Sequence, residues 1–570
     1  MDKKNIYLAL VTFSFLFISS LATAQEKDST LADLSISGSL SEYVEPSIFS
    51  ISGDAGVEGE LYSTSREVKR RPNSMGRVFI RPTLTFLSNF SISFDLFLST
   101  EGSDARQQIN RIAIHPDWGW GKAHLGDFNH KFSDYSLNGV NIRGGGVELN
   151  PGLFIFEIVG GQSRRAVAAS AYSSSYAQYL AAMRFGVGKK RGSFFTFNVV
   201  GARDDVQSLD RGIFIPDSSG GEPQIGVSPQ ENLIVGASTD FKFADKMFRI
   251  RGEFNSSLFT NNLYSEEANV DGIPSFVNNL VKIRNSTNLD YAYKAELNFA
   301  KSGVNANVKY SVINPGYRSL GMTNIINDKR RFGGLLGFRF LKNMMMIQLR
   351  YDSQNDNLLN QKLNTTTRKT YGVNLTIRPI QALSFMISAL RNNMANDAVN
   401  DTMKVDNKIT SFNINMIYQF VALNLNNSLS LGYSNQLTEN FTYLSTDLNK
   451  ITVNNIIANL NIILNSAWTV GPGFTMVMLK NIDGSTSNTI TGNFRVTNRA
   501  LRDRWKNSLN LTYATSEFTK VMQVNWISDF KLTASDVIKL KVRYSLTNYN
   551  DGKYPNFWEN IANLSIIHRL

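Results

Sequence analysis

Histidines and carboxylates, the side chains best suited to metal chemistry, are gathered in one stretch of the chain between Arg111 and Arg165. That stretch contains three of the four histidines and three aspartates, namely His115, His124, His130, Asp117, Asp127 and Asp134. Imidazole nitrogens and carboxylate oxygens are ligands for zinc and other transition metals. Their spacing matches no metal-binding motif, and histidines in exposed loops and turns explain it more simply. We therefore predict no metal site and no cofactor.

Two serines in the same stretch raise the question of a nucleophile. Ser133 or Ser136 beside a base such as His130 could form the serine–histidine pair of a membrane-embedded hydrolase. Neither serine lies in a motif that would activate its hydroxyl group. The chain contains no cysteine, which excludes thiol catalysis, disulfide bonds and a lipid anchor on cysteine. We predict that the protein is not an enzyme and has no catalytic residue, and a hydrolase is the third-ranked alternative.

Glycines follow this stretch in the sequence NIRGGGVELNPG, at residues 141–152. A phosphate-binding loop would require a helix directly after the glycines, and no helix-forming segment follows. Small residues in a strand more often relieve crowding, bend the sheet or allow another segment to approach closely. The same interpretation applies to the glycines of Val159-Gly160-Gly161.

Arginines are concentrated in the first third of the chain. Arg77, Arg81, Arg111 and Arg143 lie in segments with a strand pattern, so their role depends on the face that each occupies. On the inner face of a barrel they would form an electropositive lumen lining that favours anionic solutes. At the rims they would instead pair with carboxylates or with lipopolysaccharide phosphates. The net charge of +12 fits anionic lipids or solutes, and no nucleic-acid-binding motif is present.

Alternation of apolar and polar residues is the main structural signal, because successive side chains of a strand point to opposite faces. From Phe412 to Phe420 every second residue is apolar, and the residues between them are polar except Ile417. From Ile538 to Leu546 the apolar residues alternate with lysine, arginine and serine. Alternation over about ten residues matches a tilted membrane strand. It exceeds the roughly five or six residues of a soluble strand.

The same pattern recurs along the chain, most visibly in residues 304–312, 345–352, 371–378, 423–434, 455–465 and 505–515. Short joins at 299–303, 340–343 and 419–423 alternate with long polar connections at 204–231, 260–288, 314–329, 355–369 and 392–408. This asymmetry is typical of outer-membrane barrels, and the strand-like segments number roughly 24. We predict an all-β fold, a large single-chain transmembrane antiparallel β-barrel with an even number of strands.

Composition supports a membrane barrel over a soluble domain. Charged residues make up 19% of the chain, below the roughly 25% of an average soluble domain. After residue 24 there is no apolar run long enough for a membrane helix. A secreted soluble β-protein remains an alternative, although a solenoid or propeller would show a regular repeat.

The first 24 residues have the pattern of an export signal. Lys3 and Lys4 precede an apolar run from Ile6 to Leu21, and Ala22-Thr23-Ala24 has the small residues that signal peptidase reads. We predict a signal peptide at residues 1–24 and an outer-membrane barrel with long polar loops at residues 25–570. A membrane anchor is the alternative, but the run is shorter than the roughly 20 residues of a span.

Residues 121–167 resemble uncharacterised outer-membrane barrels of Bacteroidota. The resemblance is carried by LGDF at Leu125–Phe128, SLNG at Ser136–Gly139 and RGGG at Arg143–Gly146. A looser likeness exists to strand segments of the translocon barrel of the type IX secretion system. These likenesses imply a membrane barrel in a Gram-negative outer membrane, and they carry no functional residues over to this chain.

The sequence therefore predicts a non-catalytic outer-membrane barrel. The leading hypothesis is porin-like passage of solutes through a polar lumen, with outer-membrane lipid and lipopolysaccharide as its surroundings and anionic solutes among the candidates. The alternative is a barrel component of a protein export or surface-assembly complex, which would contact other outer-membrane proteins. A channel predicts stepwise currents in bilayers, whereas a complex component predicts co-purifying partners.

Overall fold

The computed structural model describes residues 48–87, 89–101, 110–167, 174–209, 227–268, 281–441, 449–550, 552 and 554–570. The predicted signal peptide, residues 1–24, lies outside these ranges. The described residues belong to one unit, Ile48–Leu570. Apart from strands it contains two short 3-10 turns, η1 (Leu341–Asn343) and η2 (Asp401–Met403). Among the described residues, no helix has the length and apolar character needed to cross a membrane.

The strands of the first half of the chain are β1 (Phe49–Thr64), β2 (Ser74–Phe86), β3 (Phe90–Ser99), β4 (Arg111–Asp117), β5 (Gly121–Asn129), β6 (Asn141–Leu149), β7 (Phe154–Arg164), β8 (Gln178–Gly188), β9 (Phe194–Asp204), β10 (Glu231–Phe243), β11 (Phe248–Thr260), β12 (Thr287–Lys301) and β13 (Val304–Ile313). Those of the second half are β14 (Lys329–Phe340), β15 (Met345–Asn355), β16 (Thr366–Ile380), β17 (Leu383–Asn396), β18 (Asp406–Ala422), β19 (Leu425–Asn440), β20 (Asn449–Ile463), β21 (Trp468–Lys480), β22 (Thr486–Ala500), β23 (Trp505–Thr515), β24 (Thr519–Lys531), β25 (Asp536–Tyr549) and β26 (Phe557–Arg569).

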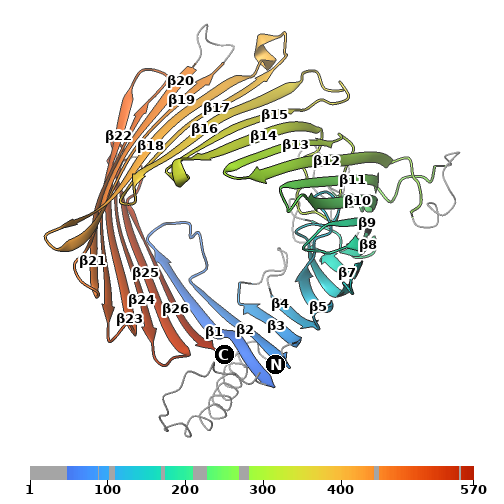
Figure 1. The fold of residues 1–570 in the computed structure, drawn as a ribbon, viewed down its shortest axis with the longest axis horizontal. Helices are drawn as coiled ribbons and strands as arrows, with labels where there is room; N and C mark the ends of the chain where they lie inside the picture. Colours follow the sequence, from blue (N-terminus) through green and yellow to red (C-terminus); the bar gives the residue numbers. More distant parts are fainter. Residues whose placement is uncertain are drawn as a thin grey trace. The chain divides into compact units, whose positions relative to one another are not determined.

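These strands form one closed antiparallel sheet. Each strand pairs with the next along the chain, and β1 also pairs with β26, from Asp54 opposite Arg569 to Thr64 opposite Glu559. Figure 1 shows the resulting ring, in which β1 and β26 lie side by side. A closed sheet leaves no strand edge unpaired, which satisfies the backbone hydrogen bonds of every strand.

The barrel has 26 strands, slightly more than the roughly 24 predicted from the sequence. Some strand boundaries leave little trace in the sequence, because a two-residue turn such as Gln381-Ala382 joins neighbouring strands. Others are missed because the strands are short. β4 and β5 have 7 and 9 residues, too few for a long alternating pattern.

Short and long connections lie at opposite ends of the barrel. Connections from even- to odd-numbered strands are short, and the longest of them spans residues 189–193. Connections from odd- to even-numbered strands include the longest ones, residues 205–230 and 261–286. We call the two ends the short-connection rim and the long-connection rim.

The inner face of the wall is identified on β8. Leu180 and Ala182 are 3% and 4% exposed, whereas Tyr179 and Phe185 on the opposite face are 52% and 40% exposed. Leu180 and Ala182 are buried against Leu137, which lies in the connection between β5 and β6. Directly opposite residues of neighbouring strands share a face. The strand register therefore identifies the inner-face residues of all the other strands, starting from β8.

Apolar side chains predominate on the outer face of the barrel. On β18, for example, Phe412 and Tyr418 point outward and are exposed, whereas Ser411 and Asn413 point inward. Aromatic residues gather on this face near the short-connection rim. We call this group the aromatic belt, and its exposed members are Phe49, Phe90, Phe154, Phe195, Phe241, Phe243, Phe340, Tyr418, Trp468 and Trp505.

Two connections fold against the inner face. The first inner segment, residues 130–140, follows β5, and the second inner segment, residues 314–328, follows β13. They meet each other, since Tyr317 donates a 2.7 Å hydrogen bond to the carbonyl oxygen of Tyr135 and Ser319 a 2.6 Å bond to that of Ser136.

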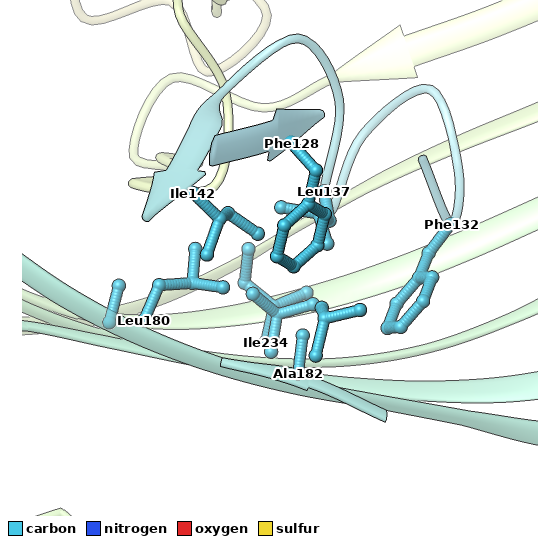
Figure 2. Packing of buried hydrophobic residues seen from close by; sticks show 10 residues of the cluster. Phe128, Phe132, Leu137, Ile142, Leu180, Ala182 and Ile234 are labelled. Carbon is cyan, nitrogen blue, oxygen red and sulfur yellow. The ribbon is translucent and has the colours of Figure 1, made fainter. Parts of the chain in front are cut away.

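An apolar cluster forms where the first inner segment lies on the wall. Figure 2 shows Leu137 and Phe132 above the wall residues Leu180, Ala182 and Ile234. Leu137 and Ile234 have no exposed surface. This cluster replaces the packed interior of a soluble protein and holds the first inner segment in place.

Candidate functional site

Three of the four arginines predicted to line the lumen point inward. Arg77 lies directly opposite Glu58 and Arg81 directly opposite Asp54, on the face away from the exposed Leu564 and Ile566 of β26. Arg111 lies on the face of β4 opposite to Ile112, which is 58% exposed.

Carboxylates surround these three arginines. Arg77 lies 3.5 Å from Glu58 and 3.7 Å from Glu101. Asp95 lies 3.3 Å from Arg81 and 3.7 Å from Arg111. Three guanidinium groups thus face three carboxylates, so this part of the lumen has little net charge, unlike the electropositive lining predicted from sequence.

Arg143 lies on the other face. Its cross-strand neighbour Asp127 shares that face, whereas Ile142 points inward into the apolar cluster. The Arg143 guanidinium holds the Asp127 carboxylate with two hydrogen bonds of 2.9 Å. Arg143 is therefore on the outer face near the long-connection rim, in a bidentate ion pair.

The three histidines, interpreted from sequence as exposed residues of loops and turns, form a network on the inner face, and only His130 of the three lies in a connection. His115 is in β4 and His124 in β5, and their Nδ1 atoms are 3.0 Å apart. His124 Nε2 is 2.7 Å from Glu148 of β6, and His130 Nε2 is 3.0 Å from Glu157 of β7. His124 and His130 are 5% and 7% exposed, so both are removed from bulk water.

Two cations complete this network. Glu157 has no exposed surface and contacts both Arg184 and Lys190, the latter at 2.9 Å. Lys190 also contacts Glu148. A buried carboxylate requires such partners, because an unpaired buried charge is strongly unfavourable.

Nitrogen and oxygen atoms of His124, His130 and Glu148 lie within 4.8 Å of one another, a separation at which they could hold a metal ion. Glu157 would act as an outer carboxylate that orients His130. However, the two carboxylates are already balanced by Arg184 and Lys190, and a divalent cation would compete with the Lys190 ammonium group. The arrangement is therefore complete as a structural ion-pair network.

Ser133 and Ser136 have roles within the first inner segment. Their hydroxyl groups are 2.6 Å apart, and Ser133 Oγ also accepts a hydrogen bond of 3.0 Å from the backbone N–H of Ser136. The hydrogen bonds that the structure gives for the two serines do not include His130. The two serines thus stabilise a turn, and they do not form a serine–histidine pair with His130.

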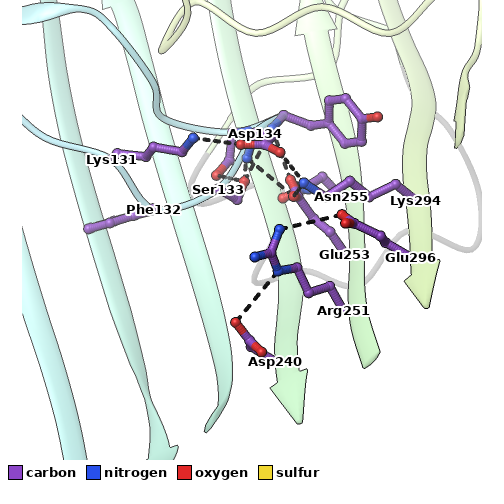
Figure 3. Close-up of polar contacts among 12 residues, drawn as sticks. Lys131, Phe132, Ser133, Asp134, Asp240, Arg251, Glu253, Asn255, Lys294 and Glu296 are labelled. Carbon is purple, nitrogen blue, oxygen red and sulfur yellow. Dashed lines mark hydrogen bonds and ion pairs between the residues drawn. The ribbon is translucent and has the colours of Figure 1, made fainter. Parts of the chain in front are cut away.

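Charged residues of β11 and β12 fix the tip of the first inner segment, as Figure 3 shows. Glu253 accepts hydrogen bonds from the backbone N–H groups of Asp134 and Tyr135, at 3.2 and 2.9 Å. Lys294 lies 3.2 Å from Glu253 and also contacts Asp134. Burial alone would raise the pKa of Asp134, but the hydrogen bonds from Lys131 and Lys294 hold it below its ordinary value.

The inner face on the other side of the barrel is uncovered by comparison. Among described side chains after Asn357, only Ser528 and Val537 are buried. Serine, threonine and asparagine predominate on the inner face there, including Asn413, Ser434, Asn459 and Thr475. An indentation of about 410 Å³ on this face is lined by Arg350, Asn374, Ser388 and Asn413. Half-buried, uncharged polar groups on a face that no other described segment covers suit contact with water.

Sequence reasoning did not find Glu148, Glu157, Arg184, Glu253 or Lys294. Each is one charged residue in a strand, and its partners are distant in the chain. His130 and Glu157, for example, are 27 positions apart. A usable signal was present, since alternation in β4 and β5 places His115 and His124 opposite to Ile112 and Leu125.

No family model matches the chain, and no curated protein matches it. Among solved structures, the translocation pore of the P pilus usher PapC is similar, with 11% identity and a TM-score of 0.37 over 91% of this chain and 99% of that chain. Acinetobacter baumannii OccAB2 has 9% identity and a TM-score of 0.30, covering 60% of this chain and 92% of that chain. The outer membrane protein OpdK of Pseudomonas aeruginosa has 8% identity and a TM-score of 0.31, covering 60% and 94%. TM-scores this low carry no argument about function, and the Bacteroidota resemblance remains a prediction.

Proposed function

We propose that the protein is an outer-membrane β-barrel of a Gram-negative bacterium that passes solutes through a polar lumen, as a porin does. The observation that carries the proposal is the orientation of side chains in a closed sheet, apolar outward and polar inward. Such a wall matches hydrocarbon on its outside and water on its inside.

The aromatic belt supports a membrane location. Its rings are exposed on the outer face and lie near the short-connection rim, where a membrane–water interface would be. Outer-membrane barrels have short periplasmic turns and longer external loops. The short-connection rim is accordingly proposed to face the periplasm and the long-connection rim to face the cell exterior.

The finer parts of the proposal come from the sequence. Residues 1–24 are proposed to direct export and to be removed, and the likeness of residues 121–167 favours a member of the Bacteroidota. Lipopolysaccharide is the proposed partner of the outer face, and the bidentate ion pair of Arg143 lies near the rim where such a contact would form. No catalytic step is proposed, because Ser133 and His130 use their polar atoms in structural hydrogen bonds.

Two measurements test this function in order. The protein extracted from outer membranes should be β-rich by circular dichroism and should migrate differently on a gel when unheated and when boiled. In planar lipid bilayers it should then produce stepwise ion currents. A soluble species with unchanged migration would refute the membrane barrel. A stable barrel that gives a silent bilayer and co-purifies with other outer-membrane proteins would refute passage and favour the export or assembly component.

A further inference from the structure

Six basic residues lie on the inner face of β22, β23 and β25, with β24 between the last two strands. We call them the basic wall, and they are Arg495, Arg499, Lys506, Lys539, Lys541 and Arg543. Their inward orientation follows from the register, because Leu540, opposite Leu564, lies on the outer face of β25. Alternating residues of that strand therefore point into the lumen.

The register shows how closely these cations lie. Arg499 is directly opposite Lys506, which in turn is opposite Asp529. A second row runs from Arg495 through Asn510 and Asn525 to Arg543. With strands about 4.8 Å apart, that row covers roughly 14 Å of the lumen wall.

The six cations of the basic wall face one carboxylate, Asp529, which lies directly opposite Lys506 and Lys539. None of its six residues forms an ion pair with another described residue, and Asp529 is the one described carboxylate on the inner face of β19–β25. Five of the six side chains are exposed, and Lys539 is half-buried. Like charges directly opposite each other destabilise a sheet, so Arg499 and Lys506 are in an arrangement that a bound anion would relieve.

Basic groups on the inner face of β2, β4 and β8 are arranged differently. Arg77, Arg81 and Arg111 are paired with Glu58, Asp95 and Glu101. Arg184 is paired with the buried Glu157. The basic wall therefore differs from these clusters in forming no ion pair among the described residues.

We infer that the basic wall is the surface by which the lumen selects anionic solutes, namely small molecules with carboxylate or phosphate groups. This inference rests on the proposed channel function and names its solute class. Guanidinium groups bind carboxylates and phosphates through paired hydrogen bonds, and lysines add point charges. Several exposed cations in a confined passage raise the local concentration of anions and lower that of cations.

Reversal potentials in planar bilayers test the inference. Under a KCl gradient, the wild-type channel should pass chloride at least about threefold better than potassium. The triple variant Arg495→Gln, Lys541→Gln, Arg543→Gln should lower that permeability ratio at least about twofold. A ratio near one in the wild type, or an unchanged ratio in the variant, would overturn the inference although the channel itself conducts.

A matched control removes three cations from the outer face. Lys450, Lys480 and Lys520 lie on β20, β21 and β24, on the faces that carry the exposed Ile456, Phe474 and Met522. Changing all three to Gln should leave the permeability ratio unchanged. Equal shifts in both triple variants would show that total charge, and not the basic wall, sets the selectivity. Heat-dependent gel migration of each variant checks that the barrel has formed.

Binding of an anionic dye tests the basic wall without any measurement of ion current. A trisulfonated pyrene dye should bind the detergent-purified wild-type protein, with binding weakened by salt and at least about fivefold by the basic-wall variant. Dye binding with a silent bilayer would refute passage while supporting the anion-binding surface. Currents without dye binding or anion preference would support passage and refute the basic wall as its selective element.

Discussion

The wall of β7 to β12 and the wall of β18 to β25 both alternate apolar outer residues with polar inner residues. The two walls differ in whether other segments of the chain cover the polar inner face. On the first wall, inner-face residues such as Glu157, Arg184 and Asn255 are buried beneath the two inner segments and have polar partners. On the second wall, residues such as Ser434 and Asn459 remain accessible. Charged residues on the inner face of the second wall, among them Arg543, form no ion pair with another described residue.

This difference shows how the covering of a polar face determines its chemistry. Where chain covers the face, charges must come in opposite pairs, because buried unpaired charge is costly. Where water covers it, charges can stay unpaired and are available to solutes. The covered wall is therefore suited to hold structure, and the open wall is suited to meet solutes.

Removing a buried charge should give the largest difference between the walls. Glu157→Ala would leave Arg184 and Lys190 without their buried partner and should reduce stability by about 3–5 kcal/mol. Asp529→Ala on the open wall should change stability by less than about 0.5 kcal/mol. To measure both changes in stability, each variant is reconstituted in lipid vesicles and titrated with urea. The urea concentration at which half of the protein loses its folded, unheated gel migration gives the midpoint. Equal losses would contradict the distinction.

Crowding the contact between the inner segments should have a smaller effect. A Cβ atom at Gly321 would lie 2.7 Å from the Ser136 carbonyl oxygen and 3.3 Å from a Val200 methyl group. Gly321→Val should therefore cost about 1–3 kcal/mol and expose residues 314–328 to protease. Gly492→Val, at a site with open space, is the control. Identical cleavage of both variants would argue that the inner segments do not pack as described.

Acidification should loosen the tip of the first inner segment. The pKa of Asp134 is lowered in the folded protein, despite burial, by the hydrogen bonds from Lys131 and Lys294. The stability it contributes is therefore present above its unfolded pKa and is lost as pH falls through the folded value. Amide hydrogen exchange of residues 130–140 should be slower in the wild type than in Asp134→Asn at neutral pH. The two proteins should converge at strongly acidic pH, and a difference that persists there would contradict this origin.

Truncating an uncharged residue of the open wall should have almost no effect. Asn459→Ala removes an accessible polar side chain and should change stability by less than about 0.5 kcal/mol. The same urea midpoints measure it. A loss above about 1 kcal/mol would mean that the open wall is covered as firmly as the other one.

Local pattern in the sequence was enough to predict most of the strands. Residues 505–515 were predicted as a strand segment and are β23. Alternation also predicted the polar face of β25, which contains Lys539, Lys541 and Arg543. These features are local, since each depends on neighbours two positions away in the chain.

Features that depend on distant partners could not be predicted in this way. Arg143 and Arg77 occur in similar strand patterns, and only the register shows that they lie on opposite faces. The anchoring of Asp134 by Lys294 joins residues 160 positions apart. The folding of residues 314–328 onto the inner face likewise leaves no periodic signal, because a connection has no fixed repeat.

The closure between β1 and β26 has a kinetic consequence. Every other strand pair joins neighbours along the chain, so these hairpins can form progressively with far shorter loops than the closing pair requires. The closing pair joins residues almost the full chain apart, as the bond from Tyr62 to Glu559 does across 497 positions. Loop-closure entropy makes such contacts slow to form. We therefore expect the pairing of β1 with β26 to limit the rate at which the barrel assembles.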